Sequence, residues 1–343
     1  MKLRVTPKAI FVLAAFGLLA AYPFFAGKFG IDLVNKIMIF AVFSLSLELL
    51  VGGTGLVCFG QAAFFGIGAY ATVLLSAQAD APSVAWLLPA ATLAAALYAL
   101  GVGALSLRTK GVYFIMVTLA FAQMAYYVVH DTPLGGGTDG IYLNAKPVLG
   151  AFIDLNQPRV LYAFTLATLA AVFAFLAVLS RSRFGRALAG IRVNEQRMRA
   201  TGFATYPYKL AAFTVSGGIA GIAGFLFAVK DGFVNPELMS WHFSGSVLIM
   251  IILGGIGHLR GALIGAFAFA LLQELFQSEA LFGPFAKHWQ LGLGLAIIAS
   301  VALLPRGLVG LPAQWSERLL GRASRRAEAA EAAEAAAAGE AAR

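Results

Sequence analysis

The chain has 343 residues and a net charge of +9; 60% of the residues are hydrophobic and only 12% are charged. Soluble domains carry roughly 25% charged residues, so a soluble globule, including a basic nucleic-acid-binding one, is excluded, and lipid must surround most of the chain. The single cysteine, Cys58, excludes an intramolecular disulfide and a cysteine-rich metal cluster, and the four histidines have no spacing typical of a metal site.

Ten apolar runs follow one another along the chain, and each is a predicted membrane helix, since about 20 apolar residues cross ~30 Å of hydrocarbon. The first, Ala9–Ala26, follows the basic residues Lys2, Arg4 and Lys8. A signal peptide begins in the same way, but there is no convincing small-residue cleavage site and further spans follow, which favours a membrane helix. The other runs are Leu33–Val51, Leu56–Ala77, Ala85–Leu107, Val112–Val129, Val160–Leu179, Leu210–Val229, Phe243–Ile256, Ala262–Phe276 and Trp289–Leu304.

Two of these runs, Phe243–Ile256 and Ala262–Phe276, are short for a full crossing. They are either two crossings, a re-entrant pair, or a broken helix inside the bundle, where irregular backbone is tolerated. The predicted fold is therefore an all-α integral membrane protein, a polytopic bundle of about 8–10 transmembrane helices.

The loops between the runs predict the orientation, because cytoplasmic loops are rich in Lys and Arg. The basic segments are the N-terminus, Arg108/Lys110, Arg181–Lys209, His258–Arg260 and the chain from Arg306 onward. The acidic or weakly basic segments are the Asp80 loop, His130–Pro158, Lys230–His242 and Glu279–His288. The two classes alternate strictly if there are ten crossings, with both termini cytoplasmic; a re-entrant pair lowers the count to eight and leaves both termini cytoplasmic. We expect one transmembrane domain over residues 1–310 and a cytoplasmic Ala/Glu/Arg-rich tail over 311–343, either a solvated helix or disordered.

Glycine clusters interrupt the apolar pattern at two places, Gly52-Gly53-Thr54-Gly55 and Gly254-Gly255-Ile256-Gly257. Interrupted helices at matching positions in two halves indicate a translocation site, although a cytoplasmic turn explains each cluster equally well. Glu48 is the main ionisable residue inside a span and is either buried or reaches the interface. The scarcity of such carboxylates disfavours an ion-coupled carrier.

No motif predicts an enzyme. The glycine-rich loop from Gly135 to Gly140 lacks the Lys-Ser/Thr that would hold phosphate, and the chain contains no Walker pattern, so it is not its own ATPase. No nucleophile–base pair has supporting spacing.

The segment Arg181–Lys209 carries seven basic residues and one acidic residue, Glu195. Four residues in it fall at helical spacing: Leu188, Ile191, Glu195 and Met198. Gly202 is a suitable helix stop. The pattern predicts one short amphipathic helix parallel to the membrane, which either a partner protein or anionic lipid would bind.

Five stretches, in this order, resemble the membrane-spanning permease subunits of branched-chain amino acid ABC importers of the LivM type. They are Gly52–Tyr70, Lys110–Met124, Gly136–Ile141, Ser182–Gly224 and Ile252–Ala266. The resemblance implies a bacterial inner-membrane protein that works with a second permease subunit, two cytoplasmic ATPase subunits and a periplasmic substrate-binding protein. ATP would be used by the partners, so no cofactor or metal is expected in this chain.

The resemblance also implies roles for particular residues. Arg192, Glu195 and Gly202 fall in the region that resembles the ATPase-coupling loop of the family. The residues expected near the translocation path are Gly60, Gln61, Phe64, Phe65, Tyr70, Thr118 and Gln123.

The chain also departs from the family pattern. Gln61 stands where His is usual, and Gln196 and Arg197 follow Glu195 in place of an adjacent alanine pair. The Gln61 difference leaves the substrate open between hydrophobic amino acids and urea or short amides. An ion-coupled carrier working alone is the alternative from a different class.

Overall fold

The computed structural model describes residues 7–77, 82–149, 153–304 and 307–311. The basic start of the chain and the tail over 312–343 lie outside these residues. Every predicted apolar run forms a helix. These helices are α1 (Pro7–Phe25), α2 (Lys28–Thr54), α3 (Gln61–Ser76), α4 (Val84–Ser106), α5 (Val112–Asp131), α6 (Pro158–Arg181), α9 (Thr205–Asp231), α10 (Trp241–Gly254), α11 (Leu259–Gln277) and α13 (Trp289–Leu303).

Seven helices in the described part are long and apolar enough to cross a membrane, and shorter apolar helices in α1, α3 and α10 accompany them. This confirms the all-α polytopic membrane fold. The remaining helical elements are α7 (Arg183–Val193), α8 (Glu195–Ala200), α12 (Glu279–Phe282), η1 (Pro133–Gly135), η2 (Gly137–Asp139), η3 (Pro236–Met239), η4 (Gly283–His288) and η5 (Leu308–Gly310). Four two-residue strands form two antiparallel pairs: β1 (Ile141–Tyr142) with β4 (Phe233–Val234), and β2 (Val148–Leu149) with β3 (Ile153–Asp154).

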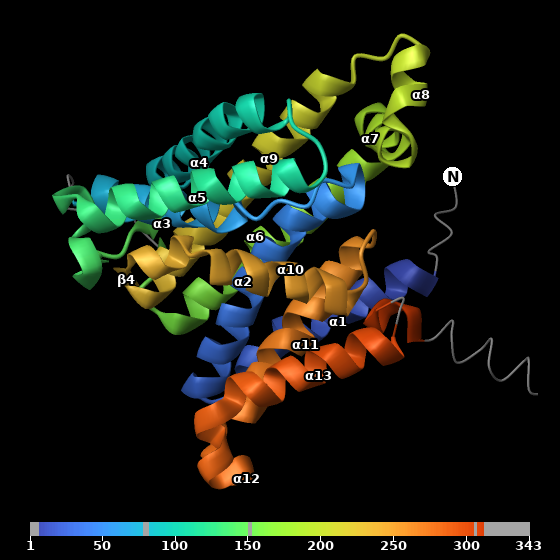
Figure 1. The fold of residues 1–343 in the computed structure, drawn as a ribbon. Coiled ribbons are helices and arrows are strands. Elements are labelled where there is room, and N and C mark those ends of the chain that lie inside the picture. Colours follow the sequence, from blue (N-terminus) through green and yellow to red (C-terminus); the bar gives the residue numbers. More distant parts are fainter. Residues whose placement is uncertain (1–6, 78–81, 150–152, 305–306, 312–343) are drawn as a thin grey trace, which may run out of the picture.

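The two ends of the bundle differ in the way that the charges predict. Helices α7 and α8, the first turns of α1 and the last turn of α13 lie at one end, and β4 lies at the other (Figure 1). The basic turn between α10 and α11 is also at the α7 end, because Gly257 of that turn lies beside Arg192 of α7. We refer to this basic end as the cytoplasmic end and to the end with the strands as the outer end.

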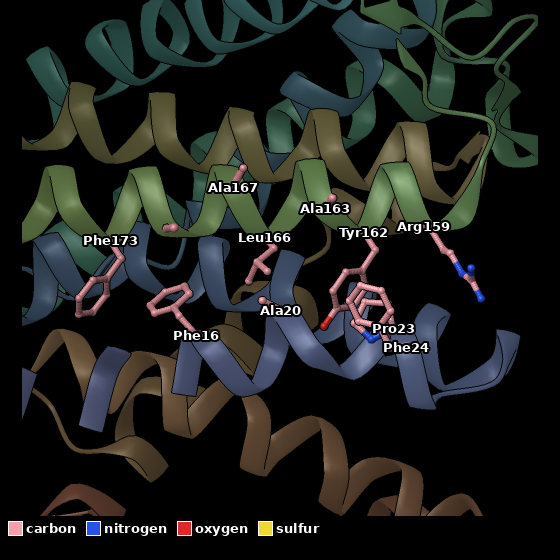
Figure 2. A pocket seen from close by; sticks show the side chains of 11 residues that line it. Phe16, Ala20, Pro23, Phe24, Arg159, Tyr162, Ala163, Leu166, Ala167 and Phe173 are labelled. Atoms are coloured by element: carbon pink, nitrogen blue, oxygen red, sulfur yellow. The ribbon is translucent and has the colours of Figure 1, made fainter. Parts of the chain in front are cut away.

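Helix α1 packs along α6 at the edge of the bundle (Figure 2). The Tyr162 hydroxyl donates a hydrogen bond to the Leu19 carbonyl at 2.7 Å, which satisfies a buried polar group in an apolar contact. Between the two helices runs a groove of about 660 Å³. Apolar side chains of both helices line it, among them Phe16 of α1 and Phe173 of α6, and Arg159 lies at its outer end. Its apolar lining suits a surface that faces lipid.

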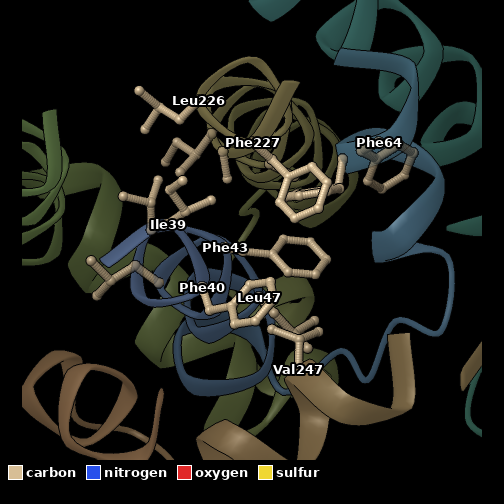
Figure 3. Packing of buried hydrophobic residues seen from close by; sticks show 14 of the residues in the cluster. Ile39, Phe40, Phe43, Leu47, Phe64, Leu226, Phe227 and Val247 are labelled. Carbon is tan, nitrogen blue, oxygen red and sulfur yellow. The ribbon is translucent and has the colours of Figure 1, made fainter. Parts of the chain in front are cut away.

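Helices α2 and α9 form the centre of the bundle. In the most apolar stretch of each helix, the buried share is 89% for α2 and 83% for α9. The corresponding shares for α4, α5, α6 and α11 are 22–33%. A helix that is apolar on all sides must be surrounded by other helices or by lipid, and here the neighbours are helices. Figure 3 shows Phe43 of α2 facing Phe227 of α9, with Phe64 of α3 and Val247 of α10 beside them.

Glycines allow the central helices to approach closely. A Cβ atom at Gly68 of α3 would collide with the backbone of Gly221 of α9, and one at Gly224 would collide with the Phe65 carbonyl. A Cβ at Gly217 would collide with Ala99 of α4. These contacts are the small-residue packing expected between membrane helices.

The two short runs form an antiparallel hairpin, α10–α11. A Cβ at Gly254 would meet the backbone of Gly261, and one at Gly265 would meet that of Met250, so the two backbones touch. Fourteen residues rise about 21 Å, less than the ~30 Å of hydrocarbon, so α10 does not cross alone. The buried irregular segment η3 precedes it, and the two runs are thus paired as a hairpin with one short arm, α10, and one longer arm, α11.

Candidate functional site

A cluster of uncharged polar side chains lies where α2, α3, α9 and α10 meet. We call Ser46, Gln61, Ser216 and Ser244 the central polar cluster. Gln61 Nε2 donates to Ser46 Oγ at 2.8 Å and to Ser216 Oγ at 3.0 Å, and Ser216 Oγ donates to the Ser46 carbonyl at 2.6 Å. Ser244 Oγ accepts the backbone N–H of Ala62 at 3.0 Å. All four side chains are fully buried, so the cluster hydrogen-bonds the four helices together in the interior.

Gln61 lies in the cluster because α2 and α3 are separate helices. Gly55 ends α2 with φ +76°, which favours glycine, and the chain then runs as irregular backbone to Gly60. Gly60 lies against the Thr118 carbonyl of α5, where a Cβ would have no room, and the Phe59 N–H donates to Thr118 Oγ1 at 3.4 Å. Irregular backbone at membrane depth needs such protein partners.

A second irregular segment enters from the outer end. Helix α9 ends at Gly232, with φ +66°, and the chain returns through β4 and η3 to the start of α10. Met239 of η3 is buried against Gly66 of α3, where a Cβ would collide with the Met239 side chain. Helix α3 begins in the interior at the fully buried Gln61, where a helix N-terminus carries partial positive charge, whereas α10 begins at the exposed Trp241.

The structure brings together most of the residues predicted for the translocation path. Gly60 contacts Thr118, and Gln61, the next residue, bonds to the central polar cluster. Phe64 and Phe65 are buried in the same part of α3, and Phe65 packs on Phe43 and Phe243 with ring centroids 4.8 and 5.1 Å apart.

Two of the predicted path residues lie apart from this group. Tyr70 lies further along α3, with its buried hydroxyl lacking a hydrogen bond to the described residues. Gln123 is half-buried on α5, a turn and a half beyond Thr118.

Sequence reasoning missed the three serines of the central polar cluster. Ser46, Ser216 and Ser244 lie in apolar helices, where a serine commonly bonds to a neighbouring helix. Nothing in the spacing of these residues indicates that they face one another, because Gln61 and Ser216 are 155 positions apart.

At the cytoplasmic end, the predicted single amphipathic helix is wrong. The α7–α8 segment, residues 183–200, consists of two helices divided at Asn194, whose extended backbone (φ −159°) leaves the helical conformation. The Asn194 side chain accepts the Arg197 N–H at 2.9 Å and so caps α8. The preference of asparagine for this N-cap position outweighs the continuous helical spacing.

Gly202 ends α8, as predicted. Its φ of +80° is left-handed, and its N–H donates to the Arg199 carbonyl at 2.9 Å. The next N–H, of Phe203, donates to the Met198 carbonyl at 3.0 Å. This pair of bonds is a Schellman motif, which favours glycine at that position.

Glu195 joins α8 to the start of α9. Its Oε1 accepts hydrogen bonds from Arg199 at 2.6 Å, Lys209 Nζ at 2.8 Å and Thr205 Oγ1 at 3.0 Å. The Lys209 side chain is only 5% exposed, so Glu195 neutralises a nearly buried ammonium. Burial by itself would raise the pKa of Glu195, but the hydrogen bonds and charges of Lys209, Thr205 and Arg199 outweigh it and hold the pKa below its usual value.

Arg192 joins α7 to the end of α2. Its guanidinium donates to the Gly52 carbonyl at 2.5 Å, at the C-terminal turn of α2 where the helix dipole favours a cation. Together, Arg192 and Glu195 attach the α7–α8 segment to both central helices. In the described part of the chain, no three His, Cys, Asp or Glu side chains are grouped so as to hold a metal ion.

A polytopic helical bundle with a buried polar cluster, and with a basic segment attached to its central helices, is an arrangement suited to a membrane transport component. Comparison with known proteins gives the family. The family described as "Branched-chain amino acid transport system / permease component" matches residues 30–301, and the chain belongs to it. It is therefore a multi-pass inner-membrane protein, and the predicted resemblance is confirmed.

Three relatives illustrate the similarity. The chain is 30% identical to the high-affinity branched-chain amino acid permease LivM of Escherichia coli K12 over 324 residues, covering 88% of this chain and 74% of that one. The LivM protein of Salmonella typhimurium gives the same identity and the same shares. A probable LivM permease of Methanocaldococcus jannaschii is 24% identical over 81% of this chain and 94% of its own. No solved structure matches the chain.

Proposed function

We propose that this chain is the transmembrane permease subunit of an ATP-driven importer and forms half of the path for branched-chain or other hydrophobic amino acids. Its partners are a second permease subunit, two cytoplasmic ATPase subunits that use the ATP, and a periplasmic binding protein that delivers the substrate. The family and the LivM relatives match most of this chain, and both are named for branched-chain amino acids. This supports branched-chain amino acids over urea or short amides as the substrate class.

One observation carries the proposal: the α7–α8 segment is attached to both central helices. Arg192 holds α2 and Glu195 holds α9, through hydrogen bonds of 2.5 and 2.8 Å. The same two helices supply Ser46 and Ser216 to the central polar cluster. A rigid helix transmits a displacement along its length, so a push on the segment by an ATPase would reach the cluster directly.

The central polar cluster is the proposed constriction of the path. Its side chains are fully buried in this conformation, which is therefore closed around them. Gln61 Oε1 is buried without a hydrogen bond to the described residues and is free to accept one from a passing substrate. The adjoining apolar wall of Phe43, Phe65 and Phe243 suits a hydrophobic side chain. Alternating access would separate Gln61 from the two serines.

The test is co-expression with the gene products encoded next to this chain, any ATPase subunits among them, followed by purification in detergent. We expect the ATPases to copurify with the wild type and to be lost or uncoupled in the Arg192→Ala, Glu195→Ala double variant. Arg197→Ala, which changes another exposed arginine of the segment, is the matched control and should retain them. In proteoliposomes, leucine uptake should require ATP and the binding protein. Uptake that persists without any ATPase would refute the proposal.

A further inference from the structure

The two glycine clusters of the sequence meet in space at the cytoplasmic end. Gly52, in the last turn of α2, lies so close to Gly257 of the α10–α11 turn that a Cβ on Gly52 would be 3.2 Å from the Gly257 Cα. Gly257 has φ +90°, a conformation that favours glycine. The function proposed above does not explain why two backbones should be brought into contact here.

A buried carboxylate occupies this junction. Glu48, one turn before Gly52 on α2, is only 3% exposed, so of the two expectations for this residue burial is confirmed. Its Oε1 accepts the Gly257 N–H at 2.7 Å. Its Oε2 is buried and has no hydrogen bond of good geometry to the described residues, although the backbone N–H of His258 also faces the carboxylate. A glutamine side chain would accept the Gly257 N–H equally well, so fixing the turn does not account for an ionisable group at this buried position.

The nearest cation is Arg192 of the α7–α8 segment. Its guanidinium lies against the junction, and a Cβ on Gly257 would be 3.2 Å from its Nη1. A Cβ on Gly52 would collide with the Glu48 carboxylate itself. The missing side chains at these two positions therefore make room for the carboxylate at Gly52 and for the guanidinium at Gly257, with only glycine backbone at the junction. Among the described residues the two groups form no ion pair in this conformation, in which Arg192 donates to the Gly52 carbonyl.

We propose that Glu48 is the buried receptor for Arg192, and that the guanidinium moves from the Gly52 carbonyl to the Glu48 carboxylate in another step of the transport cycle. The move would satisfy Oε2 with a charge-assisted hydrogen bond and would pair both charges. Because Glu48 also holds Gly257, the movement would draw the α7–α8 segment toward α2 and the α10–α11 hairpin together. Glu48 is thus a positioning residue that links the segment to a third element. This inference rests on the proposed function.

The first test measures the approach of the two residues within the chain. Cys58 is the only cysteine, so a Cys58→Ala background accepts the pair Glu48→Cys and Arg192→Cys, to be joined by a short bifunctional methanethiosulfonate. The control pair is Glu48→Cys with Arg197→Cys. We expect cross-linking well above the control, and a change of about fivefold or more when the assembled complex is trapped with nucleotide. A yield equal to the control in every state would overturn the inference.

The second test separates coupling from structural support. Glu48→Gln keeps the acceptor for the Gly257 N–H and removes only the charge. Glu48→Gln and Arg192→Gln should each lower the leucine transported per ATP hydrolysed by about tenfold, and the double variant should be no worse than either. Arg192→Lys should recover part of the loss. Losses that multiply in the double variant, or a Glu48→Gln protein with normal coupling, would overturn the inference.

The two proposals fail in different ways. If wild-type uptake does not depend on ATP, the proposed function is refuted, and cross-linking in the isolated chain still tests the Glu48–Arg192 contact. If uptake depends on ATP but the charges behave independently, only the further inference fails. The variants that retain Cys58 are first checked for folding. In a folded variant this fully buried cysteine should be protected from thiol reagents.

Discussion

The ion pair between Glu195 and Lys209 should hold α8 on α9, and Glu195→Gln should release it. The variant keeps the size of the side chain but leaves the Lys209 ammonium, 5% exposed, without its counter-charge. The cause of the destabilisation is this unpaired charge rather than the lost hydrogen bonds.

The magnitude follows from the burial of each partner. Removing one member of a fully buried pair costs ~3–5 kcal/mol, whereas an exposed pair contributes ~0–1 kcal/mol. The Glu195 side chain is 23% exposed, so solvent screens part of the effect, and we expect a cost of about 2–3 kcal/mol. That corresponds to roughly a 30- to 140-fold increase in the opening of the α8–α9 junction.

Hydrogen exchange of the backbone amides from Asn194 to Lys209 measures this opening, and thiol labelling of buried Cys58 measures global unfolding. Glu195→Gln should accelerate exchange of the segment far more than labelling of Cys58. The control Arg199→Gln removes a half-exposed partner of the same carboxylate and should have little effect. Adding Lys209→Met to Glu195→Gln should restore protection, because no unpaired charge remains. Equal exchange in Glu195→Gln and Arg199→Gln would refute the reasoning.

Three further predictions concern other parts of the molecule. Folding lowers the pKa of Glu195. The stabilisation that Glu195 gives is therefore complete above its unfolded pKa of about 4.3 and is lost as the pH falls through the lower folded pKa. Opening of the α8–α9 junction, measured by hydrogen exchange, should increase below about pH 4 in the wild type but not in Glu195→Gln. Gly68→Leu should prevent α3 from packing on Gly221 of α9, and size-exclusion chromatography should then show aggregated or unstable protein. Gln61→Leu should lower leucine uptake, and unchanged uptake would contradict a role in the path. It should also lower the free energy of unfolding, measured by Cys58 labelling, by about 1–3 kcal/mol, because Ser46 loses a buried partner.

The helices and their order could be predicted from the sequence because the requirement on each span is local. In lipid, every backbone polar group must be bonded within its own helix, so a long apolar run is sufficient to identify one. The basic loops likewise predicted which ends lie together. Gly202 was found as a helix stop because a glycine after an amphipathic run is a local signal, whereas the division at Asn194 was missed although an N-cap residue was present.

Contacts between helices could not be predicted in this way. The bonds of Gln61 to Ser216 and of Glu48 to Gly257 join residues 155 and 209 positions apart. Which face of each helix turns inward depends on the packing of all its neighbours, and a single serine or glutamate in an apolar run carries no sign of its partner.

The sequence by itself therefore determined that this is a polytopic helical membrane protein and pointed to its family; its sidedness, taken from the basic loops, stays a prediction. The tertiary structure alone decided that Ser46, Gln61 and Ser216 form one cluster, that the two glycine clusters touch, and that Arg192 and Glu195 attach one segment to both central helices. The physical reason is that helix formation in lipid is satisfied within each segment, whereas buried polar groups find their partners only when the helices are packed.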